Sequence, residues 1–200
     1  SNTANAENYQ KLFSNMITSW RTVWQDDFPF YYVQIAPFKY GDEFSGGIVR
    51  DQQRRTLSLT NTGMAMTSDI CTVEDIHPLN KQDVGLRLAN IALKDHYNLL
   101  QGQEVYGPLY ASSEITGNQI VINFNHADGL FSKGKKLNLF EISNEKGQWF
   151  AAKAKIKNGA VIVSSKEVKN PKAVRYAWRS TDIGTLFNAV GLPASTFISE

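Results

Sequence analysis

Five consecutive residues, Glu74-Asp75-Ile76-His77-Pro78, place a histidine next to two carboxylates, between an apolar strand pattern and an amphipathic helix pattern. A serine hydrolase needs an imidazole to take the proton of its nucleophile, and a carboxylate to orient that imidazole and stabilise its charged form. We therefore predict His77 as a general base and Asp75 or Glu74 as its partner. The alternative is that His77 caps the helix or forms a surface ion pair, because motif matches of this length are common.

Three other polar residues are candidates for substrate binding. Gln34 lies inside an otherwise apolar segment, and a buried amide must find hydrogen-bond partners or cost about 1–3 kcal/mol. Gln34 is therefore either part of a polar pocket or a satisfied core amide. Arg50 and Gln53 lie on nearby turns of a predicted helix and could reach a sugar carboxylate or hydroxyl, although solvated side chains are the commoner case.

The remaining histidines and the single cysteine predict neither catalysis nor a metal site. His96 ends a predicted helix, where an imidazole interacts favourably with the last carbonyl groups. His126 and Asp128 could supply two metal ligands, but a turn between strands explains the same residues. Cys71 is the only cysteine, so the chain can form no internal disulfide and no cysteine-based metal site. We predict no metal and no cofactor.

The first half of the sequence alternates helical and strand patterns. Apolar residues recur every three or four positions over 7–24, which indicates an amphipathic helix. Apolar runs at 30–36 and 64–70 have the composition of strands that are buried on both faces, and a helix is predicted over 47–58 between them.

A third helix follows the histidine motif. Asn80 is placed to cap it, and its apolar spacing runs to about Tyr97. Alternation of helices and strands predicts a parallel sheet with helices on its faces. Two strands are too few for such a sheet to stand alone, so we expect residues 1–103 to be part of a larger α/β domain.

Beyond about Gln101 the sequence takes on the pattern of short antiparallel strands. The segments of strand composition are separated by turn signals, of which Asn158-Gly159 is the strongest. We predict that residues 104–200 form an antiparallel β-sandwich domain. The predicted fold class of the whole chain is α/β followed by all-β.

Charge and hydropathy exclude two classes of partner. The 21 basic and 19 acidic residues give a net charge of +2, and they are scattered without the clustered stripe that binds a phosphate backbone. Nucleic acid is therefore not an expected partner. No apolar run approaches the ~20 residues of a membrane helix, so no membrane span is expected. The hydrophobic content of 42% is that of a soluble globular chain.

Several blocks of the sequence resemble one family. Asp75-Ile76-His77-Pro78 and the residues over 80–89 are similar to the histidine block of bacterial sialate O-acetylesterases, members of the SGNH hydrolase superfamily. The resemblance implies the C-terminal part of an SGNH-type α/β/α parallel-sheet domain followed by a β-sandwich, with no need for a cofactor or metal. It covers nearly the whole chain, through further blocks at 8–24, 32–38, 61–66, 174–178 and 191–195.

The resemblance also implies roles for individual residues. His77 would be the general base, Asp75 its partner and Asn2 an oxyanion-binding asparagine. Glu74 stands at the spacing at which many SGNH hydrolases carry their acid, so both carboxylates stay candidates. The nucleophilic serine of the family lies in a Gly-x-Ser block far upstream, and this sequence contains no such block.

The chain would then be a C-terminal portion that is inactive alone. Its partners would be the N-terminal half of the same protein and, where apolar faces stay uncovered, a second copy in a homo-oligomer. The implied activity is hydrolysis of O-acetyl esters of sialic acids, in a periplasmic or secreted bacterial enzyme. Two alternatives stay open: an acetyl esterase for other acetylated glycans, and a non-catalytic carbohydrate-binding or interaction module.

Overall fold

The computed structural model describes residues 2–134 and 136–199, and for Asn2 it describes the backbone only. The chain divides into two compact units. The first comprises Ser1–Tyr106 together with Arg179–Thr181, and the second comprises Gly107–Trp178 together with Asp182–Glu200. The first unit thus includes three residues from far downstream. The predicted role of residues 1–103 as part of a catalytic domain stays a prediction.

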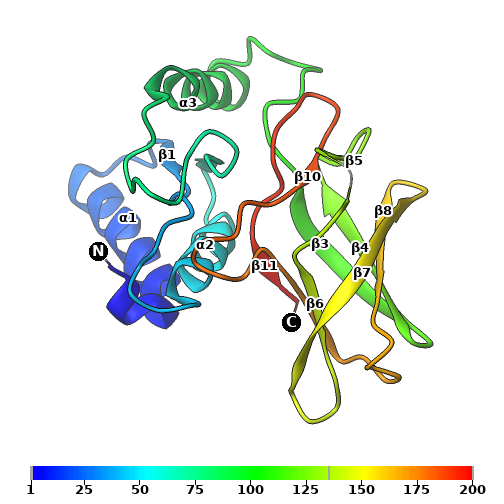
Figure 1. The fold of residues 1–200 in the computed structure, drawn as a ribbon. Coiled ribbons are helices and arrows are strands. Elements are labelled where there is room, and N and C mark those ends of the chain that lie inside the picture. The colour runs from blue at the N-terminus through cyan, green and yellow to red at the C-terminus, as the bar shows by residue number, and fades with distance from the viewer. Residues whose placement is uncertain (1, 135, 200) are drawn as a thin grey trace. The chain divides into compact units, whose positions relative to one another are not determined.

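The described part of the first unit contains a parallel pair of short strands and three α-helices (Figure 1). Its strands pair in register from Phe30 opposite Thr62 to Val33 opposite Ala65. The elements in chain order are the 3₁₀ segment η1 (Asn2–Asn8), α1 (Tyr9–Trp24), β1 (Phe30–Val33), α2 (Ser45–Thr56), β2 (Thr62–Ala65) and α3 (Lys81–Asp95).

Helix α1 packs one side of its apolar stripe against β1. Ile17 is fully buried, and the ring of Phe13 meets those of Phe30 and Tyr32 at centroid distances of 5.8 and 4.9 Å. The predicted amphipathic helix is confirmed, but much of its apolar surface is not covered within this unit. Four large apolar side chains of α1 are exposed: Leu12, Trp20, Val23 and Trp24.

Helix α3 begins where its sequence predicts. The side-chain oxygen of Asn80 accepts the backbone N–H of Asp83 at 3.1 Å, which satisfies one of the free donors of the first turn. Ile91 is the buried anchor of this helix, in a small core with Ala65 and Val105. The predicted cap of the third helix is therefore confirmed.

The described part of the second unit is built around a large antiparallel sheet that nearly closes on itself. Seven strands are hydrogen-bonded in the order β11-β9-β6-β7-β8-β4-β3, and β5 and β10 form a separate small pair. The strands, shown in Figure 1, are β3 (Leu109–Thr116), β4 (Gln119–Asn125), β5 (Phe131–Ser132), β6 (Phe140–Ser143), β7 (Trp149–Lys157), β8 (Ala160–Ser164), β9 (Ala173–Tyr176), β10 (Leu186–Phe187) and β11 (Phe197–Ile198).

Contacts between the two edge strands bring the ends of this sheet together. The ring of Tyr110 in β3 stacks on that of Phe197 in β11 at a centroid distance of 4.7 Å. Nearby, the backbone N–H of Ser195 donates to the carbonyl of Pro108 at 3.0 Å. Alternate residues of the strands point inward, and the side chains of Ile120, Ile122, Val161 and Val163 in β4 and β8 form the fully buried centre of the core.

The tightest predicted hairpin is confirmed. Asn158 and Gly159 connect β7 to β8 with φ angles of 51° and 77°. Two successive positive φ values are what a type I′ turn requires, and its twist matches that of the flanking strands.

The predicted fold class is wrong for both halves of the chain. The first unit shows no α/β/α parallel sheet of the SGNH type among its described residues, because β1 and β2 pair only with each other. The second is one nearly closed antiparallel sheet and not a two-layer sandwich. An apolar run in the sequence indicates that its residues are buried, but it does not indicate that they pair with another strand. Ala36 and Met66 are 5% and 4% exposed, yet both lie beyond the ends of β1 and β2.

No helix in the described part of the chain has both the length and the apolar character that a membrane crossing requires.

Candidate functional site

A cavity of about 470 Å³ lies in the first unit, where the parallel strands end. β1 ends at Val33 and β2 at Ala65, and the residues that follow them, including Gln34 and Thr67, line the cavity. Ligands of parallel sheets bind at this carboxyl edge because loops diverge there. The complete lining is Thr3, Tyr9, Val33, Gln34, Ile35, Ala36, Tyr40, Val49, Thr67, Ile76, Pro78, Lys81 and Val84.

The histidine motif borders this cavity. Ile76 and Pro78 line it, whereas the side chain of His77 between them is 82% exposed. Asp75 accepts the backbone N–H of His77 through Oδ1 at 2.8 Å, which folds the motif into a tight turn. The same oxygen lies 3.8 Å from Nδ1 of His77, an ion-pair distance that is longer than a hydrogen bond.

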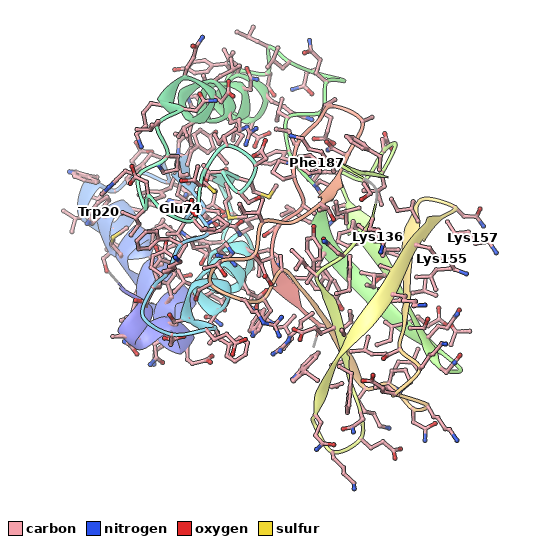
Figure 2. The ribbon with its side chains drawn as sticks, viewed as in Figure 1. Trp20, Glu74, Lys136, Lys155, Lys157 and Phe187 are labelled. Carbon is pink, nitrogen blue, oxygen red and sulfur yellow. The ribbon has the colours of Figure 1, made fainter. Side chains whose placement is uncertain are left out.

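The structure therefore brings the predicted base together with one of its two candidate partners. Asp75 is within ion-pair distance of the imidazole, whereas no ion pair or hydrogen bond between Glu74, labelled in Figure 2, and His77 is found among the described residues. A rotation that shortens the distance from Oδ1 to Nδ1 by about 1 Å would give the hydrogen bond of a His–Asp pair.

A partly buried ion pair anchors the loop that carries the motif. The guanidinium of Arg87 in α3 binds both carboxylate oxygens of Asp69, each at 2.7 Å, and also donates to the carbonyl of Met66 at 2.6 Å. Bidentate pairs of this kind fix orientation as well as distance. The loop is thus tied to α3 near its start by Asp69 and at its end by the Asn80 cap, while residues 74–77 between them stay exposed.

Gln34 has the features of both predicted alternatives. Its side chain is 2% exposed, and its Nε2 donates to the carbonyl of Arg50 at 3.0 Å. The backbone carbonyl of Gln34 accepts a hydrogen bond from the hydroxyl of Thr67 at 3.0 Å. Gln34 is therefore a hydrogen-bonded core amide that also lines the cavity.

Arg50 and Gln53 are buried rather than solvated, and both bind backbone. Gln53 accepts the N–H of Ile35 at 2.8 Å and donates to the carbonyl of Val33 at 3.2 Å, so its amide extends the hydrogen bonding of β1. Arg50 donates to the carbonyls of Arg179 and Ser180 at 2.7 and 3.2 Å. Neither side chain lines the cavity. Their assignment to substrate binding stays a prediction.

The predicted oxyanion residue, Asn2, begins η1, and its side chain lies outside the described atoms. The next residue, Thr3, lines the cavity. The role of Asn2 stays a prediction.

Sequence reasoning missed the two tyrosines of the cavity. Burial raises the pKa of the Tyr9 hydroxyl, and a hydrogen bond with Gln53 opposes that rise. Burial also raises the pKa of Tyr40, whose hydroxyl donates to the carbonyl of Ala36 at 2.8 Å, while the nearby charge of Arg50 lowers it. Both groups thus stay neutral hydrogen-bonding groups at neutral pH. The signal was weak, because Tyr9 looked like one more member of the apolar stripe of α1.

No group of three or more histidine, cysteine, aspartate or glutamate side chains in the described part of the chain is arranged to hold a metal ion.

No protein-family model and no curated protein matches this sequence. Among solved structures, the chain is similar to XAC1771, a novel carbohydrate acetylesterase from Xanthomonas citri, with a TM-score of 0.91 and 34% sequence identity. The alignment covers 98% of this chain and 46% of that enzyme, so the chain spans less than half of the length of its neighbour. At the level of class, the comparison therefore supports the predicted likeness to a carbohydrate acetyl esterase, and it names no particular sugar.

Proposed function

We propose that this chain supplies the base of a carbohydrate esterase that removes O-acetyl groups from sialic acids or related glycans. The observation that carries the proposal is the Asp75–His77 pair, 3.8 Å apart at the rim of the cavity, in a chain that is 34% identical to a carbohydrate acetylesterase. Sialic acid is the substrate that the sequence blocks suggest, and other acetylated sugars are the alternative.

In the proposed reaction, a serine oxygen forms a bond to the acetyl carbon while its proton passes to Nε2 of His77. The imidazolium, held by Asp75 through Nδ1, then gives that proton to the departing sugar oxygen. Water cleaves the acetyl-serine in the same way, which releases acetate and restores the serine. Asn2 would donate to the developing oxyanion, together with backbone N–H groups.

This chain covers 46% of its structural neighbour. The serine would come from a portion of the protein that corresponds to the remainder of that neighbour. The exposed apolar face of α1 is a suitable docking surface for that portion. Val23 and Trp24 on this face are 75% and 61% exposed, and Trp20, labelled in Figure 2, belongs to it. Without that portion, the chain should self-associate through this face at micromolar concentration. Sedimentation as a monomer under those conditions would count against the docking surface.

Acetate release tests the activity. The chain alone should not hydrolyse an activated acetate ester, whereas the longer protein should act on O-acetylated sialic acid or on acetylated polysaccharide. In that protein, Asp75→Ala should lower kcat by about 10²–10⁴-fold, the usual contribution of an acid–base group, while Glu74→Ala should change it little.

The reverse order of these two variants would assign the carboxylate role to Glu74. Turnover by the chain alone that survives His77→Ala would overturn the proposal. Glycan binding by the longer protein without any acetate release would favour the binding-module alternative.

A further inference from the structure

Positive charge is concentrated in the second unit. By sequence it carries 11 Lys and Arg against 7 Asp and Glu, whereas the first unit carries 10 against 12. The overall charge of +2 therefore hides a basic unit with a net charge of +4. An excess of this size on one unit is a reason to look for a surface where the cations gather.

Three lysines lie in one line on the outer face of β7. Lys153, Lys155 and Lys157 are exposed, whereas the residues that alternate with them, such as Ala154 and Ile156, pack against the core. Successive members of the line are about 6.8 Å apart because side chains on one face of a strand are two residues apart. Figure 2 shows Lys155 and Lys157 projecting from the strand into solvent.

Among the described residues, the neighbours of this lysine strip on β8 are neutral and the carboxylate beside it on β6 is already paired. The residues opposite the three lysines on β8 are Ser164, Ile162 and Ala160. On the other side, Glu141 of β6 is opposite Ala151 and forms a 2.8 Å ion pair with Arg175. Like charges in a row repel one another, and the carboxylate on the adjacent strand β6, Glu141, is already paired with Arg175 and does little to offset the repulsion. The strip is therefore arranged for an external anion.

We propose that the lysine strip binds a chain of carboxylated sugars, which deepens the proposed function and rests on it. The strip runs along one strand, with its members about 6.8 Å apart, so it presents three cations to an extended ligand and not one cradle to a single small anion. Its outer-face neighbours Ile162, Ala160 and Val121 are small or aliphatic, which suits sugar rings. The same face of β7 also carries Trp149, but the guanidinium of Arg175 already lies over that ring at 4.4 Å, so the lysines are not interleaved with open rings for stacking bases. The acidic glycan would hold the enzyme on its polymeric substrate.

Binding of polysialic acid to the 200-residue chain tests this proposal. The triple variant Lys153→Gln, Lys155→Gln, Lys157→Gln should weaken binding about tenfold, which corresponds to three exposed ion pairs of ordinary strength. Binding of the unaltered chain should weaken with added salt, because exposed charges are screened. Dextran, a neutral glycan, should not bind.

A matched control separates the strip from net charge alone. Lys146→Gln, Lys166→Gln and Lys169→Gln remove the same charge from exposed positions in turns of the same unit. An equal loss of polysialic acid binding in both triple variants would overturn the proposal. Binding of single-stranded DNA as tight as that of polysialic acid would overturn the assignment to a glycan.

The strip and the esterase site can fail independently. In the longer protein, the triple variant of the strip should leave hydrolysis of an O-acetylated monosaccharide unchanged and raise KM for an acetylated acidic polymer. An unchanged KM for the polymer would contradict glycan binding by the lysine strip but not the esterase function. No hydrolysis of either ester would contradict the esterase function, and polysialic acid binding by the strip would be unaffected by that result.

Discussion

The two units bury different kinds of side chain at their centres. In the first, Arg50, Gln53 and Gln34 are at most 2% exposed, and each donates to a backbone carbonyl. In the second, the central strands β4 and β8 bury aliphatic residues such as Ile122 and Val163, which are fully buried. A unit with short strands has few ladder hydrogen bonds, so buried polar side chains satisfy the backbone in their place.

The cavity, with the proposed site beside it, belongs to the unit with the less regular backbone. Polar side chains such as Gln53 hold Val33 and Ile35 in position, so the chain can leave the sheet early and form the wall of a cavity. In the second unit β7 and β8 form a regular hairpin. Its exposed face can therefore bind a ligand along its surface but does not enclose one. The comparison predicts that polar substitutions damage the first unit and apolar truncations the second.

The largest effect is expected for Arg50→Ala. The substitution leaves the carbonyls of Arg179 and Ser180 without these donors, which costs about 1–3 kcal/mol. It also leaves a cavity where a fully buried long side chain was, so we expect a total loss of about 3–5 kcal/mol in the stability of the first unit. Hydrogen exchange should show the loss in α2 and β1 while the core of β4 and β8 stays protected. Lys39→Ala, at an exposed position, is the control and should change little. Equal loss of protection in both units would contradict the comparison.

The converse experiment is Ile122→Ala in β4. Ile122 is fully buried in the core of the sheet, and truncation there should cost about 3 kcal/mol through lost burial and a cavity. Urea unfolding followed by the fluorescence of Trp149, with the other three tryptophans replaced by phenylalanine, would report this loss. The stability of the first unit should be unaffected in hydrogen exchange. A loss below about 1 kcal/mol would show that the sheet does not depend on its aliphatic centre.

A smaller effect is expected at the end of the histidine loop. Asn80→Ala removes the cap of α3 and should cost about 1 kcal/mol, while Asn80→Ser, which can still cap, should recover most of it. Hydrogen exchange at Asp83 and in the following turn measures the difference. If both variants behave alike, the cap does not hold this end of the loop.

The smallest effect is a pH dependence at α2. Hydrogen bonds from the backbone N–H groups of Ser45 and Phe44 lower the pKa of Asp42 below its usual value. Because the folded pKa lies below the unfolded one, the stabilisation is complete above the unfolded value and is lost as the pH falls through the folded value. NMR titration of Asp42 should show the low pKa, and Asp42→Asn should remove this part of the acid sensitivity. An ordinary pKa would contradict it.

Local structure was largely predictable from the sequence, whereas pairing was not. Asn80 and Asn158-Gly159 have local signals, and the cap and the turn form as expected. The extent of β1 was overestimated because Ala36 is buried by tertiary packing and not by a sheet. The sequence also could not show that residues 179–181 belong with the first unit, because the contacts of Arg50 with them cross about 130 positions.

The same limit applies to the site. The spacing within Asp75-Ile76-His77 is enough to bring the two side chains near each other, and they lie 3.8 Å apart. Gln34 could be placed at a pocket because an amide in an apolar run is unusual. Tyr9 and Tyr40 reach the same cavity from different elements, which only the three-dimensional fold reveals.

The most direct test compares two exposed histidines in the longer protein. His77 is at the rim of the cavity, whereas His96 follows α3 at the opposite end of the parallel pair and meets the ring of Tyr97 edge-on. Acetate release from an O-acetylated sugar should fall by about 10²–10⁴-fold in His77→Ala and stay unchanged in His96→Ala. Equal rates for His77→Ala and the unaltered protein would contradict the assignment of His77 as the base.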